Sequence, residues 1–251
     1  MTELEIRKAI CDVGRRMYEK NLVAATDGNI SVRLGPSRFL CTPSSVSKGY
    51  MQPHEIILAD AEGKKLSGPG RVTTEFFTHL AAYEERSDIA AVCHAHPPKA
   101  IGFSVAGVSL AECVLPEVVM SIGGIPTTDY ATPGTREGNA VVRELIRQAD
   151  AVILDRHGAV TVGVDVFDAY YKMEKIEHAA ETLLVARLLG EVRSLSPQEI
   201  DKLAEARRLY GARGKAYSRG AAECSLTPGN QHDPQYERII QETLRILGKS
   251  I

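Results

Sequence analysis

The feature that most constrains the fold of this 251-residue chain is a short apolar run that ends in two histidines and two prolines. Residues Ile89 to Cys93 are all apolar, and His94-Ala95-His96-Pro97-Pro98 follows directly. We expect a buried strand that ends at the prolines, because a run this short suits a strand and proline cannot continue a sheet ladder. Alternate side chains of a strand share a face, so His94 and His96 converge, with Cβ atoms about 7 Å apart.

A second apolar run, Ala151 to Leu154, predicts another buried strand, and it ends at Arg156-His157-Gly158. Residues 159–162 then read as the return strand of a hairpin. Small-molecule sites gather at strand ends in α/β sheets. We therefore predict a metal centre of His94, His96 and His157, whose three imidazoles leave the fourth zinc position open, as in catalytic sites. A His-x-His pair alone is weak evidence, and the alternative is a pair of ordinary hydrogen-bonded histidines.

The other four histidines are expected to be structural. They lie in predicted helices or loops and lack a second ligand-type residue at a chelating spacing. They are His54, His79, His178 and His232.

The rest of the chain alternates helical and strand-like patterns, which predicts one α/β domain with a central sheet covered by helices. Helices are expected over residues 2–20, 73–85, 136–148, 166–189, from 196 onward, and from 233 to the end. Further short strands are expected at residues 30–33, 39–41, 56–58, 108–110 and 125–127. The main domain is taken as residues 1–210 and the remainder, 211–251, as a C-terminal extension with a final helix.

Composition excludes several classes of protein. Lys and Arg total 30 against 32 Asp and Glu, and a net charge of −2 gives no field that attracts nucleic acid. No apolar run reaches the ~18 residues of a membrane helix, and the acidic N-terminus does not resemble a signal peptide. The five cysteines form no CxxC pair, so we expect reduced thiols and a cytoplasmic location.

Glu75 is a candidate acid/base because it stands among apolar residues at the start of the expected helix 73–85. Partial burial raises the pKa of a carboxyl group toward that of a useful general base. The alternative is a glutamate that complements the dipole of the first helical turn.

Three segments are suited to bind an anion through hydroxyls and backbone amides. They are Asp27-Gly28-Asn29-Ile30-Ser31, the stretch Thr42-Pro43-Ser44-Ser45-Val46-Ser47-Lys48-Gly49, and Thr73-Thr74. None of them matches the P-loop pattern, and plain turn chemistry is the alternative for the glycines and serines.

Taken in order, these segments resemble the class II aldolase/adducin family. The matching stretches are Gly28-Asn29-Ile30-Ser31, Thr42-Pro43-Ser44, Thr73-Thr74-Glu75, His94-Ala95-His96, Tyr130-Ala131-Thr132-Pro133-Gly134-Thr135 and His157-Gly158. The resemblance spans roughly residues 5–190 and implies a three-layer α/β/α fold with a mixed, mainly antiparallel sheet. It also implies a homotetramer with the active site at a subunit interface.

The resemblance assigns a role to each candidate residue. The three histidines bind zinc or a similar divalent ion, and Glu75 is the acid/base that fills the open metal position at rest. The expected phosphate-binding residues are Gly28, Asn29, Ser44, Ser45, Thr73 and Thr74.

The aldolase branch of the family fits better than the epimerase branch. Leu209-Tyr210-Gly211-Ala212-Arg213 resembles the aldolases' C-terminal segment, whose catalytic tyrosine, here Tyr210, reaches a neighbouring site. The apolar stripe Ile239, Ile240, Leu244 and Leu247 independently predicts association. Three residues depart from the pattern. Ser45 replaces a phosphate-loop glycine, Glu117 stands where a catalytic tyrosine is expected, and Pro133 replaces an aromatic wall residue.

The expected reaction is cleavage of a sugar phosphate, a ketose 1-phosphate, to dihydroxyacetone phosphate and an aldehyde. Fuculose, 5-deoxyribulose and 5-methylthioribulose 1-phosphates are the substrates considered. The alternatives are a 4-epimerase or dehydratase of the same fold, and a non-catalytic, adducin-like binding module.

Overall fold

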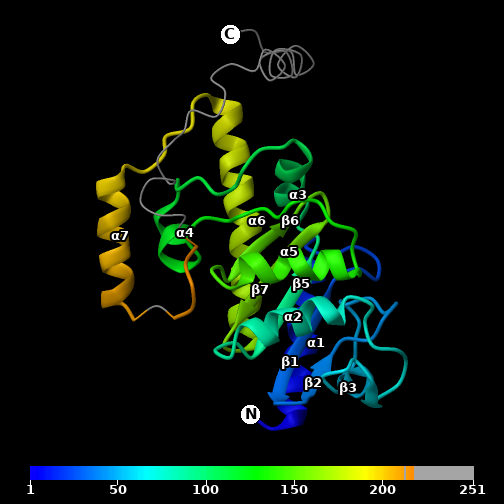
Figure 1. Ribbon diagram of the computed structural model, residues 1–251. Helices are drawn as coiled ribbons and strands as arrows, with labels where there is room; N and C mark the ends of the chain where they lie inside the picture. The colour runs from blue at the N-terminus through cyan, green and yellow to red at the C-terminus, as the bar shows by residue number, and fades with distance from the viewer. Residues whose placement is uncertain (212, 218–251) are drawn as a thin grey trace, which may run out of the picture.

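A seven-stranded antiparallel sheet forms the centre of the computed structural model, which describes residues 1–211 and 213–217 (Figure 1). The strands are β1 (Asn29–Gly35), β2 (Arg38–Cys41), β3 (Ile57–Ala59), β4 (Lys65–Ser67), β5 (Ala91–Ala95), β6 (Ala151–Leu154) and β7 (Gly158–Gly163). Their order across the sheet is β4-β3-β2-β1-β5-β7-β6, and every neighbouring pair is antiparallel. The expected mixed character is limited to isolated parallel bridges, such as Thr127 with Ile153.

Helices cover both faces of this sheet. They are α1 (Glu3–Glu19), the 3₁₀ turn η1 (Pro53–Glu55), α2 (Phe76–Glu85), α3 (Pro98–Val105), α4 (Pro116–Ser121), α5 (Arg136–Ile146), α6 (Val166–Leu189) and α7 (Pro197–Leu209). Capping boxes at Thr2 and Ser196 start α1 and α7, the two helices that the sequence predicts from residue 2 and from residue 196.

Strand β5 shows how the sheet separates two cores. Ala91, Cys93 and Ala95 belong to the core that includes α1 and α6, whereas Val92 faces the core of α2 and α5. Figure 1 shows α2 and α5 together on the near side of the sheet and α6 behind it. The three-layer α/β/α architecture expected from the sequence is confirmed. His94 shares the face of Val92, so it points toward α2 and α5.

Two sequence-based expectations about local structure are wrong. Residues 108–110 and 125–127 contribute only isolated bridges instead of strands. Pro98 and Pro116 each begin a helix that the sequence analysis missed. A proline at the first helical position is tolerated because its missing N–H has no partner there anyway, so Pro97-Pro98 ends β5 and also starts α3.

A buried charged network joins β6 to both helical layers. The Arg86 and Asp150 side chains are each 1% exposed, and Arg86 Nη2 lies 2.8 Å from Asp150 Oδ1. The Lys172 ammonium lies 2.8 Å from the other oxygen of Asp150. Because Asp150 directly precedes β6, this network holds the start of the β6–β7 hairpin that carries His157.

The described part of the C-terminal extension packs on the main domain. The Lys215 carbonyl accepts from Asp150 N, and Tyr217 N donates to the Ile122 carbonyl. The expected final helix and His232 lie outside the described residues.

The cysteines only partly match expectation. Cys11, Cys41 and Cys93 are free, and burial raises the pKa of Cys11 to about 11 and that of Cys41 to about 12. Cys113 is disulfide-bonded, which corrects the expectation of reduced thiols at that position. Among the described residues, no helix is long and apolar enough to cross a membrane.

Candidate metal centre

Sheet pairing brings the three predicted histidines together. His94 lies near the end of β5, opposite Asn29 of β1 on one side and Val160 of β7 on the other. His157 lies in the turn between β6 and β7, with its N–H on the Leu154 carbonyl. The C-terminal end of β5 therefore lies next to the turn of the β6–β7 hairpin, at one end of the strands.

The imidazole nitrogens are spaced as ligands of one ion. One ring nitrogen from each histidine lies within 4.8 Å of the others, and His94 Nε2 is 3.1 Å from His96 Nε2. Two nitrogens bound to a tetrahedral zinc ion at ~2.0–2.1 Å are about 3.3 Å apart. His94 Nδ1 lies 3.0 Å from the Ala159 carbonyl, to which it donates, and this leaves Nε2 free for a metal. The group could therefore hold a divalent ion.

Gly158 is required for this arrangement. A Cβ atom there would lie 2.5 Å from the Ala95 carbonyl oxygen and 2.9 Å from ring carbons of both His94 and His96. Any larger residue would push the two rings out of place.

Glu75, the N-cap residue of α2, completes the cluster from above the sheet. Its Oε2 is 3.3 Å from His94 Nε2, and its Oε1 is 3.5 Å from His157 Nε2. Asn29 Nδ2 donates to Oε2 at 2.9 Å. The carboxylate therefore lies where a fourth ligand would stand, next to the three nitrogens.

The expected rise in the pKa of Glu75 is wrong. Burial alone would raise the pKa, but His94, His157 and the hydrogen bond from Asn29 outweigh it and hold the pKa well below its ordinary value. Glu75 is thus a carboxylate at neutral pH, the form that can bind a cation.

The histidines respond to the same surroundings. Burial and the neighbouring His94 lower the pKa of His157 to about 4 and also lower the pKa of His96. For His94, burial works in the lowering direction, but Glu75 overcomes it and the net pKa is raised. His96 and His157 are therefore neutral at pH 7, the form in which imidazole binds metals.

Asp27 is a site residue that the sequence analysis named only as part of a turn. Asn29 of β1 is paired with His94 of β5, and two residues beyond this pair on each chain segment Asp27 Oδ2 lies 3.6 Å from His96 Nδ1. Gly28 makes the turn possible, because its φ is +72° and a Cβ would lie 2.4 Å from Val23 Cγ1. A carboxylate beside a ligating histidine is a common supporting partner in metal sites.

The three segments expected to bind phosphate lie side by side. Ile30 N donates to Thr42 Oγ1 at 3.2 Å, and Pro43 forms an antiparallel bridge with Val72. This places Ser44 and Ser45 beside Thr73 and Thr74. All four residues are at least partly exposed.

Two details of these loops differ from a plain turn. Ser45 has a φ of +61°, the conformation that glycine adopts most easily. Lys48 is buried and donates to the carbonyls of Thr26 and Val46, so it ties the loop at residues 24–28 to the loop at residues 43–48. Burial lowers the pKa of Lys48 to about 8.

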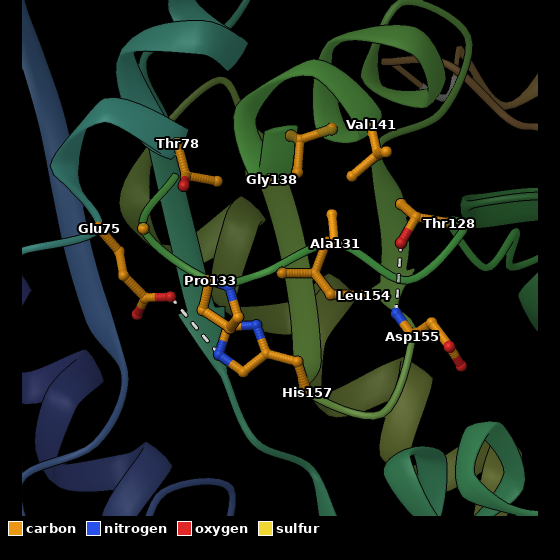
Figure 2. A pocket seen from close by; sticks show the side chains of 12 residues that line it. Glu75, Thr78, Thr128, Ala131, Pro133, Gly138, Val141, Leu154, Asp155 and His157 are labelled. Carbon is orange, nitrogen blue, oxygen red and sulfur yellow. Dashed lines mark hydrogen bonds and ion pairs between the residues drawn. The ribbon is translucent and has the colours of Figure 1, made fainter. Parts of the chain in front are cut away.

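A small pocket, open to solvent, lies beside Glu75 and His157. Figure 2 shows these two side chains at one end, with Pro133 and Ala131 on the wall and Thr78 and Val141 behind. Its remaining lining residues are Thr128, Gly134, Gly138, Val142, Leu154 and Asp155. The segment 130–135, singled out in the sequence, therefore forms one wall of this pocket.

Apart from His79, the remaining candidates lie away from the histidine cluster within this chain. Tyr210 is the C-cap of α7 and is 79% exposed, and Glu117 is exposed at the start of α4. His54 and His178 are exposed, whereas His79 is a fully buried residue of α2. None of these five side chains belongs to the possible metal-binding group of the described residues, which is His94, His96 and His157.

The chain is similar to known proteins over most of its length. Residues 8–184 match the family model described as class II aldolase and adducin N-terminal domain. An L-fuculose phosphate aldolase from Methanococcus maripaludis is 34% identical over 66% of this chain and 89% of its own length. A 3-oxo-tetronate 4-phosphate decarboxylase from Cupriavidus necator is 31% identical over 72% of this chain and 84% of its own length.

Solved structures show the same likeness. The L-fuculose-1-phosphate aldolase from Thermus thermophilus superposes with a TM-score of 0.66 at 28% identity, covering 76% of this chain and 98% of that one. YgbL from Klebsiella pneumoniae superposes with a TM-score of 0.74 at 26% identity, covering 81% of this chain and 99% of that one.

Proposed function

This chain belongs to the class II aldolase and adducin family, and on that premise we propose that it is a zinc-dependent aldolase. The substrate is a ketose 1-phosphate, and the products are dihydroxyacetone phosphate and an aldehyde. Another divalent ion is the alternative to zinc.

One observation carries the proposal, namely the cluster of three imidazole nitrogens within 4.8 Å of one another, with the Glu75 carboxylate against them. His94, His96 and His157 would hold the ion. Lewis-acid stabilisation of the charge that develops on the substrate's carbonyl oxygen is the chemistry that a bound divalent ion supplies. Neutral nitrogen ligands are suited to zinc.

The protein's own residues handle the phosphate and the protons. Ser44, Ser45, Thr73 and Thr74, with Gly28 and Asn29 beside them, bind the phosphate through hydroxyls and amides. When the C3–C4 bond breaks, its electron pair stays on C3 of the dihydroxyacetone phosphate fragment. Glu75, which first takes up a proton from solvent, delivers that proton to C3; the C4 hydroxyl loses its own proton to the accepting group, which returns it to solvent, as the aldehyde carbonyl forms.

The group that takes the C4 hydroxyl proton is proposed to come from a neighbouring subunit. Tyr210 is exposed at the end of α7 and is free to reach a second chain. Glu117 lies exposed on α4, the helix against which α7 packs, with Arg207 Nη1 donating to the Ser121 carbonyl at 2.7 Å. We therefore propose a homotetramer with shared sites and a cytoplasmic location, with residues 1–210 as the catalytic domain.

The pocket beside Glu75 supports a small aldehyde fragment with an apolar end. Pro133, Ala131 and Leu154 line it, and Thr128 and Asp155 offer polar atoms nearby. Fuculose 1-phosphate, 5-deoxyribulose 1-phosphate and 5-methylthioribulose 1-phosphate all present such an end, so these three are the substrates to try first.

A second candidate is decarboxylation of a phosphorylated 3-oxo acid. It is favoured by the relative from Cupriavidus necator, which is named a 3-oxo-tetronate 4-phosphate decarboxylase. Loss of carbon dioxide beside a carbonyl also leaves an electron pair on carbon, so the same metal ligands and the same proton donor serve both reactions. The same site could also serve a sugar-phosphate 4-epimerase or dehydratase, and the same fold could serve as a non-catalytic binding module.

The test is a product screen on the zinc-loaded protein. The three ketose 1-phosphates are assayed for dihydroxyacetone phosphate, and 3-oxo-tetronate 4-phosphates for carbon dioxide. Dihydroxyacetone phosphate release that stops with a chelator and returns with zinc supports the proposal. Carbon dioxide release alone would replace it with the decarboxylase. Neither product from the zinc-loaded protein would reject both.

A further inference from the structure

A hydrogen-bond ladder joins β1 to α2 directly beside the metal centre. Asn29 Nδ2 donates to Glu75 Oε2 at 2.9 Å. Ser31 Oγ lies 2.7 Å from His79 Nδ1 and 2.9 Å from the Tyr83 hydroxyl. Asn29 and Ser31 are two residues apart on one face of β1, and Glu75, His79 and Tyr83 are four residues apart on one side of α2.

Two buried polar atoms in this ladder have no hydrogen-bond partner, Asn29 Oδ1 and His79 Nε2. Both residues are at most 2% exposed. An unpaired buried polar group costs about 1–3 kcal/mol, so each of these atoms requires an explanation.

Counting protons shows whether His79 Nε2 is a hydrogen-bond donor or an acceptor. If Nε2 carries the ring proton, Tyr83 donates to Ser31 and Ser31 donates to His79 Nδ1, so every proton of the trio except Nε2–H is used. If Nδ1 carries it, the direction reverses and the Tyr83 hydroxyl is left without an acceptor among the described residues, in addition to a bare Nε2 lone pair. The first arrangement leaves fewer groups unsatisfied, so Nε2–H is a donor. Burial lowers the pKa of His79 to about 3, and the ring stays neutral.

The orientation of Asn29 is settled in the same way. Its amide nitrogen must face the Glu75 carboxylate, because two oxygens would repel each other. Its carbonyl oxygen Oδ1 therefore turns away from Glu75 and needs a donor. The ladder thus holds one unpaired donor, His79 Nε2–H, and one unpaired acceptor, Asn29 Oδ1, in its neighbouring residue pairs. The Tyr83 hydroxyl is already used by Ser31 Oγ.

We propose that His79 is a positioning residue of the metal centre, whose Nε2–H donates to one ordered water that in turn donates to Asn29 Oδ1. By fixing the Asn29 amide, it holds the Glu75 carboxylate against the three histidines. This role differs from the ordinary structural histidine that the sequence predicts at this position. Its effect on turnover rests on the proposed aldolase function, whereas the hydrogen-bond arrangement does not.

The first test is independent of activity. Long-range ¹H–¹⁵N NMR of the zinc-loaded protein reports which ring nitrogen of His79 carries the proton. We expect the Nε2–H form with a proton protected from exchange, and loss of that protection in Asn29→Ala. The Nδ1–H form, or an Nε2 proton whose exchange is unchanged in Asn29→Ala, would overturn the proposal whatever reaction the protein catalyses.

The second test separates positioning from packing. His79→Leu should keep zinc, since the three ligands are untouched, and keep KM within about threefold, while turnover falls about 10–100-fold, the usual effect of a lost supporting hydrogen bond. His79→Gln, which retains an N–H donor, should recover part of that loss. His178→Leu is the matched control, because it makes the same change at an exposed histidine of α6, and should stay within about threefold in turnover. Thermal melting identifies any variant that fails to fold.

Equal losses in the folded Leu and Gln variants, or turnover of His79→Leu within threefold of the parent, would contradict the positioning role. If the parent protein releases no dihydroxyacetone phosphate, the aldolase proposal fails separately and the NMR result alone decides the inference.

Discussion

Replacing Glu75 with glutamine changes one atom at the centre of the proposed chemistry. The glutamine has the same shape as the glutamate, so Asn29 can still donate to its carbonyl oxygen at the 2.9 Å position. The change removes the negative charge that lies 3.3 Å from His94 and 3.5 Å from His157, and it removes the group that accepts and returns a proton.

The size of the effect follows from these contacts. Three imidazole ligands remain, and losing a neighbouring carboxylate weakens metal binding about 10–100-fold, which saturating zinc offsets. A positioned acid/base contributes about 10²–10⁴-fold to a rate, equal to about 2.7–5.5 kcal/mol of transition-state stabilisation. We therefore expect Glu75→Gln, fully loaded with zinc, to lose about 10²–10⁴-fold in kcat with KM within about threefold.

Two assays measure this loss. Dihydroxyacetone phosphate release follows the whole cleavage reaction, and hydrogen–deuterium exchange into dihydroxyacetone phosphate in D₂O follows proton transfer at carbon alone. Both should fall by similar factors. Glu84→Gln is the matched control, because Glu84 lies on the same helix but pairs with Arg143 at the surface. A zinc-loaded Glu75→Gln protein that exchanges deuterium within a fewfold of the parent would refute the assignment of Glu75.

Three further predictions concern assembly and stability. Inactive Glu75→Gln chains and impaired Tyr210→Phe chains should recover activity when co-assembled, and no recovery in verified mixed oligomers, or a fully active monomer, would rule out shared sites. Asp150→Ala removes the buried carboxylate that Arg86 and Lys172 share and leaves them only their more exposed partners Asp88 and Asp168, so the free energy of unfolding in urea should fall by about 3–5 kcal/mol; a loss below about 1 kcal/mol would contradict this reading of the network. The hydrogen bond from Arg86 lowers the pKa of Asp88 to about 2, so Asp88 adds stability above about pH 4 that is lost as the pH falls toward 2. In Asp88→Asn the urea midpoint should therefore depend less on pH between about 4 and 2; an unchanged pH dependence would show that the Arg86–Asp88 pair contributes nothing to stability.

The sequence predicted the positions that depend on local pattern. His94 and His96 were predictable because strand periodicity places them on one face, and a strand end is where a ligand can approach. The hairpin that carries His157 was predictable from two apolar runs separated by a short turn. The helices that begin at Glu3 and Pro197 were predictable from their N-terminal residues, the Thr2–Glu5 capping box for the first and the Ser196 N-cap followed by proline for the second.

What the sequence could not supply depends on contacts between distant segments. Asp27 reaches His96 only because β1 pairs with β5 in one particular register. The pKa of Glu75 was predicted in the wrong direction, because burial was apparent from the sequence but the nearby histidines and Asn29 were not. The role inferred for His79 likewise depends on Ser31, 48 residues away in the chain.

The most direct measurement of the central claim is the metal content of the purified protein and of His94→Ala after zinc loading and dialysis. We predict one divalent ion per chain in the parent protein and in the control His178→Ala, whose histidine is exposed on α6, and almost none in His94→Ala. Full occupancy in a folded His94→Ala protein would contradict the three-histidine centre, and with it the proposed aldolase chemistry.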